Sequence, residues 1–175
     1  MSKALKLTVA LGLTLLLAAA AMVASAATQF VVRTDLTGYQ EVPAISSTAN
    51  GTFRAEITTG NKIKYRLRYS DVEGVSITQA HIHFGQKGVN GAIVVFLCSN
   101  LGNGPVGTPA CPAAPGEVTG TLTADDMVGL AAAQGIAAGE FGELRRAIRQ
   151  GFAYVNIHSE TYTGGEARGQ LREVD

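Results

Sequence analysis

The sequence predicts an all-β fold: an antiparallel Greek-key β-sandwich with a short two-helix insertion. Two observations carry this prediction. Much of the chain alternates apolar and polar residues with a period of two, which is typical of strands buried on one face. Clusters of turn residues, such as 71–74 and 85–91, separate these runs at the short spacing of sandwiches and barrels rather than that of β-α-β units.

Two neighbouring runs alternate most clearly. Their apolar members are Phe53, Ala55 and Ile57 in the first run and Ile63, Tyr65, Leu67 and Tyr69 in the second. If Ile57 and Ile63 face the same core, they must lie opposite each other across a hairpin. Residues 59–61 then form a three-residue loop, in which Gly60 or Asn61 can adopt a positive φ.

The remaining elements follow from the same reasoning. Further strands are predicted at residues 29–35, 76–84, 92–98, 117–123, 152–158 and 166–172. Thr123 can cap a first helix that ends near Gly135. A second helix is predicted to start near Gly139 and to end at Gly151. Its apolar stripe, which should pack against the sheet, consists of Phe141, Leu144 and Ile148.

The N-terminus has the pattern of a cleavable signal peptide. Lys3 and Lys6 precede an apolar run at residues 7–21, and the small-x-small triplet Ala24-Ser25-Ala26 follows it. A membrane anchor is the alternative, but a span needs about twenty apolar residues. We therefore expect a signal at residues 1–26 and one mature domain at 27–175. This domain should be secreted or periplasmic, with no membrane span after the signal is removed.

The charge balance argues against nucleic acid as a partner. The chain has 14 Lys+Arg and 14 Asp+Glu, and removal of Lys3 and Lys6 leaves a mature net charge of 12 − 14 = −2. Proteins that bind nucleic acid through their overall field are strongly basic.

Two cysteines, Cys98 and Cys111, remain in the exported chain, and an even pair in an oxidising compartment predicts a disulfide. The Gly- and Pro-rich segment between them reads as a loop. A thiol metal pair is the weaker alternative, because twelve intervening residues is an unusual ligand spacing and no histidine lies near.

The chain has three histidines, and their positions predict a shared site. His81 and His83 stand two residues apart in a predicted strand, so they share one face, about 7 Å apart at Cα. His158 ends another strand, on the face opposite Val155 and Ile157, and so also points away from the core. Three imidazoles with an open position suit zinc or copper.

The last predicted hairpin adds neighbours to this site. The simplest register places Ile157 opposite Ala167, and therefore His158 opposite Glu166 and Asn156 opposite Arg168. Metal-bound imidazoles need a hydrogen-bond acceptor behind them, so Glu166 is a candidate for that role or for a ligand. Asn156 and Arg168 are further candidates for the surroundings of the metal.

Other interpretations of these residues stay open. The three histidines can serve packing or hydrogen bonding alone. The stripe Lys62, Lys64, Arg66 and Arg68 can be a solvated sheet face or a contact for an anionic polymer. No Gly-x-Ser-x-Gly elbow is present, and the glycine-rich residues 85–91 form a turn rather than a phosphate loop.

Five segments resemble the CHRD family, named after the repeated domain of the animal protein chordin. They are LTGYQEVP (36–43), AHIHFG (80–85), GVNG (88–91), GFAYVNIH (151–158) and GEARGQL (165–171). The resemblance implies an extracellular β-sandwich module. In chordin the family binds secreted signalling proteins, and this chain looks like a stand-alone microbial member.

A weaker likeness links the His-x-His-Phe-Gly segment to copper/zinc superoxide dismutases, and with three histidines it supports a single-metal site at most. We therefore expect an exported binding module with one copper or zinc ion on His81, His83 and His158. The alternatives are a metal-dependent redox enzyme, in which Arg168 draws in an anion, and a purely structural or adhesive module. The expected partners are a metal ion, an extracellular protein or a polysaccharide.

Overall fold

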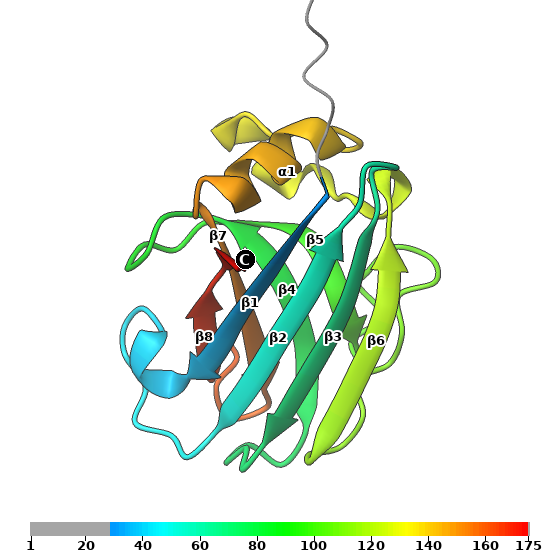
Figure 1. Cartoon of the computed structure of the whole chain (residues 1–175). Coiled ribbons are helices and arrows are strands. Elements are labelled where there is room, and N and C mark those ends of the chain that lie inside the picture. Colours follow the sequence, from blue (N-terminus) through cyan, green and yellow to red (C-terminus); the bar gives the residue numbers. More distant parts are fainter. Residues whose placement is uncertain (1–28, 175) are drawn as a thin grey trace, which may run out of the picture.

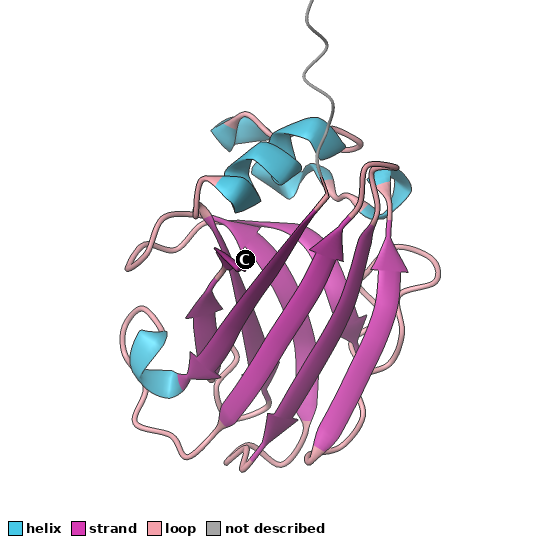
Figure 2. Ribbon diagram, in the orientation of Figure 1, coloured by secondary structure: helices cyan, strands magenta, loops and turns pink. Residues whose placement is uncertain are grey.

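The computed structural model describes residues 29–174, so the predicted signal peptide lies outside the described residues. These residues form nine strands (Figures 1 and 2). The strands are β1 (Phe30–Thr37), β2 (Asn50–Ile57), β3 (Ile63–Ser70), β4 (Ile77–Phe84), β5 (Ala92–Ser99), β6 (Gly116–Leu122), β7 (Ala153–Ser159), β8 (Ala167–Gln170) and β9 (Arg172–Val174). Every predicted strand is present, and the last is divided into β8 and β9.

The strands form one continuous sheet in the order β5-β4-β7-β8-β1-β2-β3-β6, with β9 added to β1, and every pair is antiparallel. In Figure 1 the sheet curls, so that β1, β2, β3 and β6 form the near wall while β4, β5 and β7 lie behind. The predicted all-β class is confirmed, as a sheet nearly closed into a barrel.

Side chains and a disulfide hold the two end strands of the sheet, β5 and β6, near each other. The hydroxyl of Tyr65 on β3 donates to the carbonyl of Leu97 on β5 at 2.6 Å. Cys98 on β5 is bonded to Cys111 in the loop that leads to β6, with a Cα–Cα distance of 5.1 Å. The predicted disulfide is therefore confirmed.

The hairpin between β2 and β3 has the predicted register. Ile57 lies opposite Ile63, and both are buried. Asn61 supplies the positive φ of the turn, at 54°. The apolar alternation therefore placed this hairpin correctly, because a one-residue slip would turn the whole buried set toward solvent.

The helical insertion caps one end of the barrel (Figure 2). Of its two predicted helices, only the second is present. The second helix, α1 (Phe141–Arg149), buries its predicted stripe. In place of the first predicted helix, the chain forms two 3-10 segments, η2 (Ala124–Asp126) and η3 (Gly129–Gln134). None of the helices within residues 29–174 is long and apolar enough to cross a membrane.

Pairing with the sheet explains the missing helix. Met127 forms a bridge with Val95, and the amide of Val128 donates to the carbonyl of Val94 at 2.9 Å. Both bonds require extended backbone between the two 3-10 segments, so a continuous helix cannot form there. The predicted cap is nevertheless present, since Thr123 accepts a hydrogen bond from the amide of Asp125.

Candidate metal centre

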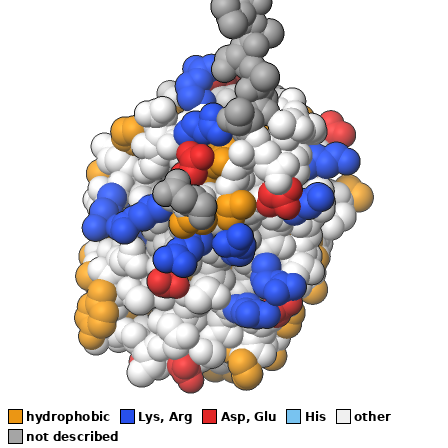
Figure 3. Space-filling view, viewed as in Figure 1, with side chains coloured by type: hydrophobic (Ala, Val, Ile, Leu, Met, Phe, Trp, Pro, Cys, Tyr) orange, Lys and Arg blue, Asp and Glu red, His pale blue; other side chains and the backbone are white. Residues whose placement is uncertain are grey.

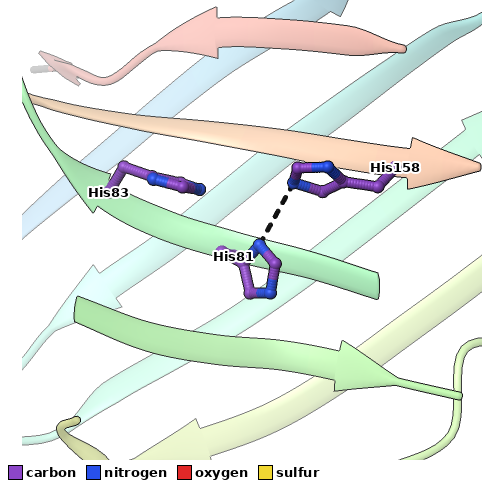
Figure 4. A group of neighbouring side chains, drawn as sticks. All are labelled: His81, His83 and His158. Carbon is purple, nitrogen blue, oxygen red and sulfur yellow. Dashed lines mark hydrogen bonds between the residues drawn. The ribbon is translucent and has the colours of Figure 1, made fainter. Parts of the chain in front are cut away.

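Adjacent strands bring the three histidines together. His81 and His83 lie on β4, His158 lies on β7, and these two strands pair. Figure 4 shows the three rings side by side on one face of the sheet. One ligand atom from each ring lies within 4.8 Å of those of the other two. The predicted clustering of the three histidines is therefore confirmed.

Three loops bury this face of the sheet: the covering loops 38–49, 85–91 and 160–166. The first two are joined by a bond from Asn90 to the carbonyl of Val42 at 2.9 Å. The first and third are joined by a bond from Ser47 to the Glu166 carboxylate at 2.8 Å. Consequently the exposed fraction of the three histidines is only 0% to 7%.

The spacing of two ring nitrogens already suits a metal ion. His81 Nδ1 lies 3.2 Å from His158 Nε2. Two nitrogens that bind one tetrahedral zinc ion at 2.0–2.1 Å stand about 3.3 Å apart. His83 is farther from this pair, with its ring centroid 5.4 Å from that of His81 and 6.4 Å from that of His158. A small rotation of His83 would complete the set.

Backbone carbonyls fix which nitrogen two of the rings present. His83 Nδ1 lies 2.9 Å from the carbonyl oxygen of Gly91, and His158 Nδ1 lies 2.9 Å from that of Thr163. A carbonyl only accepts, so both Nδ1 atoms carry the proton and both Nε2 atoms carry a lone pair. This is the arrangement that orients metal-binding histidines in known sites.

Burial keeps the three rings neutral. It lowers the pKa of His81 to about 2, with the neighbouring His158 and His83 adding to the effect. Burial also lowers the pKa of His83 to about 4, against the raising influence of the Gly91 carbonyl, and it lowers that of His158. Neutral imidazole is the form that binds a metal ion.

The side-chain amide of Asn156 lies against the ring of His158 in the cluster. Its Oδ1 lies 3.0 Å from His158 Nε2, while its amide group is bonded to the buried carboxylate of Glu41. With the His158 proton on Nδ1, a carbonyl lone pair and a ring lone pair face each other. Two lone pairs at this distance repel unless a proton or a cation lies between them. His81 Nδ1, 3.2 Å from His158 Nε2, can donate a proton to this ring lone pair, and a cation bound between the rings would take the place of that bond.

Two further ring nitrogens of the cluster lack a hydrogen-bond partner within the described part of the chain. His81 Nε2 and His83 Nε2 are buried and have no hydrogen-bond partner. Buried polar atoms normally have one, so each unpaired atom requires an explanation. A metal ion that binds the cluster would satisfy at least His83 Nε2.

The predicted register of the last hairpin is confirmed, since Asn156 pairs with Arg168 and Ile157 with Ala167. Glu166 has a different environment from the one expected. Its carboxylate accepts from Ser47 and from the amide of Glu73 at 2.7 Å. Within residues 29–174 its carboxylate forms no hydrogen bond with a histidine, and the acceptors behind His83 and His158 are main-chain carbonyls instead.

Arg168 is buried, and the hydrogen bonds of its guanidinium within residues 29–174 all go to the 85–91 loop. It donates to the carbonyls of Gln86 at 3.3 Å and Val89 at 2.8 Å, and to Asn90 Oδ1 at 3.0 Å. Its guanidinium lies 3.4 Å from the ring centre of Tyr154, which in turn stacks on His83 at 4.7 Å. Arg168 therefore holds the cover of the site rather than facing an entering anion.

Glu41 was not among the predicted site residues. It lies next to Asn156, and burial raises its pKa to about 7, opposed by the charge of Arg168 and the bond from Asn156. The carbonyls of Gly91 and Thr163 were also missed, because a main-chain acceptor leaves no signal in a residue type. For Glu41 the only signal was its place in the segment 36–43.

The fold and the cluster together define a class: a disulfide-bonded, all-β domain with three histidines buried under loops on the outside of its barrel. The chain belongs to the CHRD domain family, whose model matches residues 32–171. Neither a curated protein nor a solved structure matches the chain.

Proposed function

We propose that this protein is an exported metal-binding module that holds a single copper or zinc ion on His81, His83 and His158. The observation that carries the proposal is the convergence of three buried, neutral imidazoles, in which Nε2 of His81 and Nε2 of His83 have no hydrogen-bond partner among the described residues. Asn156 Oδ1 is the fourth candidate donor, because it already lies 3.0 Å from His158 Nε2. Imidazole nitrogen suits both metals.

The surroundings of the cluster favour a metal-binding module over a redox enzyme. The covering loops leave the rings almost without exposed surface. The guanidinium of Arg168, the candidate for drawing in an anion, is engaged by three partners of the 85–91 loop. A redox enzyme would need an opening toward substrate beside the metal. Export is supported by the disulfide, which persists in oxidising compartments, and by the signal pattern.

The test is metal titration of the purified mature protein. After chelation and dialysis, Zn²⁺ and Cu²⁺ should each bind at one ion per chain in calorimetry. His83→Ala should weaken binding by more than about 100-fold, since removing even a supporting residue typically costs 10- to 100-fold. Asn156→Leu should weaken it roughly tenfold or more. Tyr39→Phe, which removes a hydroxyl from a side chain that is 73% exposed, is the matched control and should bind as the parent does.

Circular dichroism and thermal unfolding of the metal-free variants separate loss of binding from loss of fold. The proposal fails if the parent takes up no ion at micromolar concentration. It also fails if folded His83→Ala retains a full equivalent of metal with unchanged affinity.

A further inference from the structure

The exposed outer face of β9, β1, β2 and β3 carries a row of four arginines that runs across the strands. Arg172 lies opposite Arg33, Arg33 opposite Arg54, and Arg54 opposite Arg66. All four are exposed. The sequence suggested only a basic stripe along one strand, and the registers reveal this row at right angles to it. Like charges directly opposite one another destabilise a sheet, so the row is not explained by stability.

Most of this charge is not neutralised by the protein. Arg66 lies 3.4 Å from Glu117, which also pairs with Arg68. Arg33, Arg54 and Arg172 form no ion pair with any residue in 29–174. Neighbouring strands are about 4.8 Å apart, so the row presents positive charges at a regular spacing of about 5 Å.

Two separate hollows lie along the row. A hollow of 280 Å³ is lined in part by Arg33 and Arg172, and a second of 440 Å³ in part by Arg54 and Arg66. Figure 3 shows basic side chains gathered over this wall of the barrel, with acidic ones between them. The registers place the acidic residues Asp35, Glu56 and Glu117 in the rows on either side. These two rows also contain Lys64 and Arg68, so the arginine row lies between rows of mixed charge.

The types of side chain on this face indicate which class of polyanion it can bind. Single-stranded nucleic acid is bound by aromatic side chains on which bases stack, and membranes by apolar side chains beside the basic ones. The exposed large apolar residues of the described chain all lie on other segments: Tyr39, Val75, Val89, Leu101, Val106, Leu130 and Phe152. A linear chain of acidic sugars needs neither kind of contact.

We propose that the row of Arg172, Arg33, Arg54 and Arg66 binds a linear polysaccharide that carries carboxylates on successive sugars. The planar guanidinium donates two parallel hydrogen bonds to a carboxylate, which makes arginine the best residue for this ligand. Binding through exposed charges weakens as salt rises. This site lies on a different wall from the histidines and does not depend on the metal.

The experiment measures binding of polygalacturonate to the purified mature protein at low salt, with uncharged dextran as the blank polymer. Arg33→Gln/Arg54→Gln should weaken binding roughly thirtyfold, since each basic residue near an anionic surface contributes about fivefold. Lys87→Gln/Arg146→Gln removes the same charge from other surfaces and should change binding less than about threefold. All four positions are exposed, so both variants should fold.

Three results would overturn the proposal. The first is equal loss in the two double variants, which would mean attraction to total charge. The second is unchanged binding in Arg33→Gln/Arg54→Gln. The third is tighter binding of single-stranded DNA or of anionic lipid vesicles than of polygalacturonate, with the same dependence on Arg33 and Arg54.

Discussion

Two walls of this barrel have the same alternation of inward- and outward-facing residues, but their outward-facing residues differ in exposure. On β2 and β3, alternate residues point away from the core and almost all of these are exposed. On β7 and β8, alternate residues also point away from the core, yet every residue is buried. The covering loops 38–49, 85–91 and 160–166 make the difference.

The comparison shows what a cover does to polar side chains. Exposed arginines on β2 and β3 are solvated and can face one another. Under the loops, each polar group needs a partner in the protein, because an unpaired buried one costs about 1–3 kcal/mol. Arg168 has its partners, whereas Nε2 of His81 and Nε2 of His83 have none among the described residues, and this lack supports the proposed metal site.

The largest difference between the two walls is expected when one arginine on each wall is replaced by alanine. Arg168→Ala should lower the free energy of unfolding by about 3 kcal/mol, because it leaves the carbonyls of Gln86 and Val89 unpaired and removes the contact with Tyr154. Arg54→Ala should change it by no more than about 0.5 kcal/mol, and in the stabilising direction, because it relieves repulsion from its neighbours. Urea unfolding of the two variants measures both values, and equal losses would contradict the assigned roles.

The covered wall should also make the metal-free protein sensitive to acid. Unfolded histidines titrate near pH 6.5, and burial lowers the pKa of all three in the folded state, that of His83 to about 4. Their contribution to stability is complete above pH 6.5 and is lost as pH falls from 6.5 toward 4, where the unfolded chain binds more protons.

Glu41 opposes this trend over much of the same range. Its folded pKa of about 7 lies above its ordinary value of 4.5, so its contribution is complete below pH 4.5 and is lost as pH rises through 7. The two protons that His81 and His83 lose on folding, less the one that Glu41 gains, leave about one proton, or about 1.4 kcal/mol per pH unit near pH 5.5, and the lowered pKa of His158 adds to this slope. Urea unfolding from pH 4.5 to 7.5 measures the slope, and His81→Leu should reduce it by about 1.4 kcal/mol per unit. A flat profile would mean that the rings titrate normally in the folded protein.

A smaller effect is expected from two glycines in turns on the two walls. A Cβ on Gly165, which has a φ of 130°, would lie 2.5 Å from Glu41 Oε1. Gly165→Ala should therefore lower the free energy of unfolding by about 2 kcal/mol. The matched substitution Gly60→Ala, in the β2–β3 hairpin, meets nothing closer than 3.8 Å and should change it by less than about 0.5 kcal/mol. Thermal unfolding compares the two, and a harmless Gly165→Ala would show that the cover over Glu41 is loose.

The sequence by itself determined the strands, the β2–β3 hairpin, the disulfide and the shared face of the histidines. These depend on local alternation or on covalent chemistry. Ile57 and Ile63 can share a core in only one register, and His81 and His83 share a face in any strand. The pairing of Asn156 with Arg168 followed from the same parity.

Only the tertiary structure decided which strands are neighbours and what covers them. The pairing of β4 with β7 joins residues that are 69 to 82 positions apart, and no pattern within either strand encodes it. The same holds for the helix lost to pairing with β5, for the carbonyls behind His83 and His158, and for the row of arginines. Each arises from contacts between segments distant in sequence, where packing and hydrogen bonding with a partner outweigh the local preference of the chain.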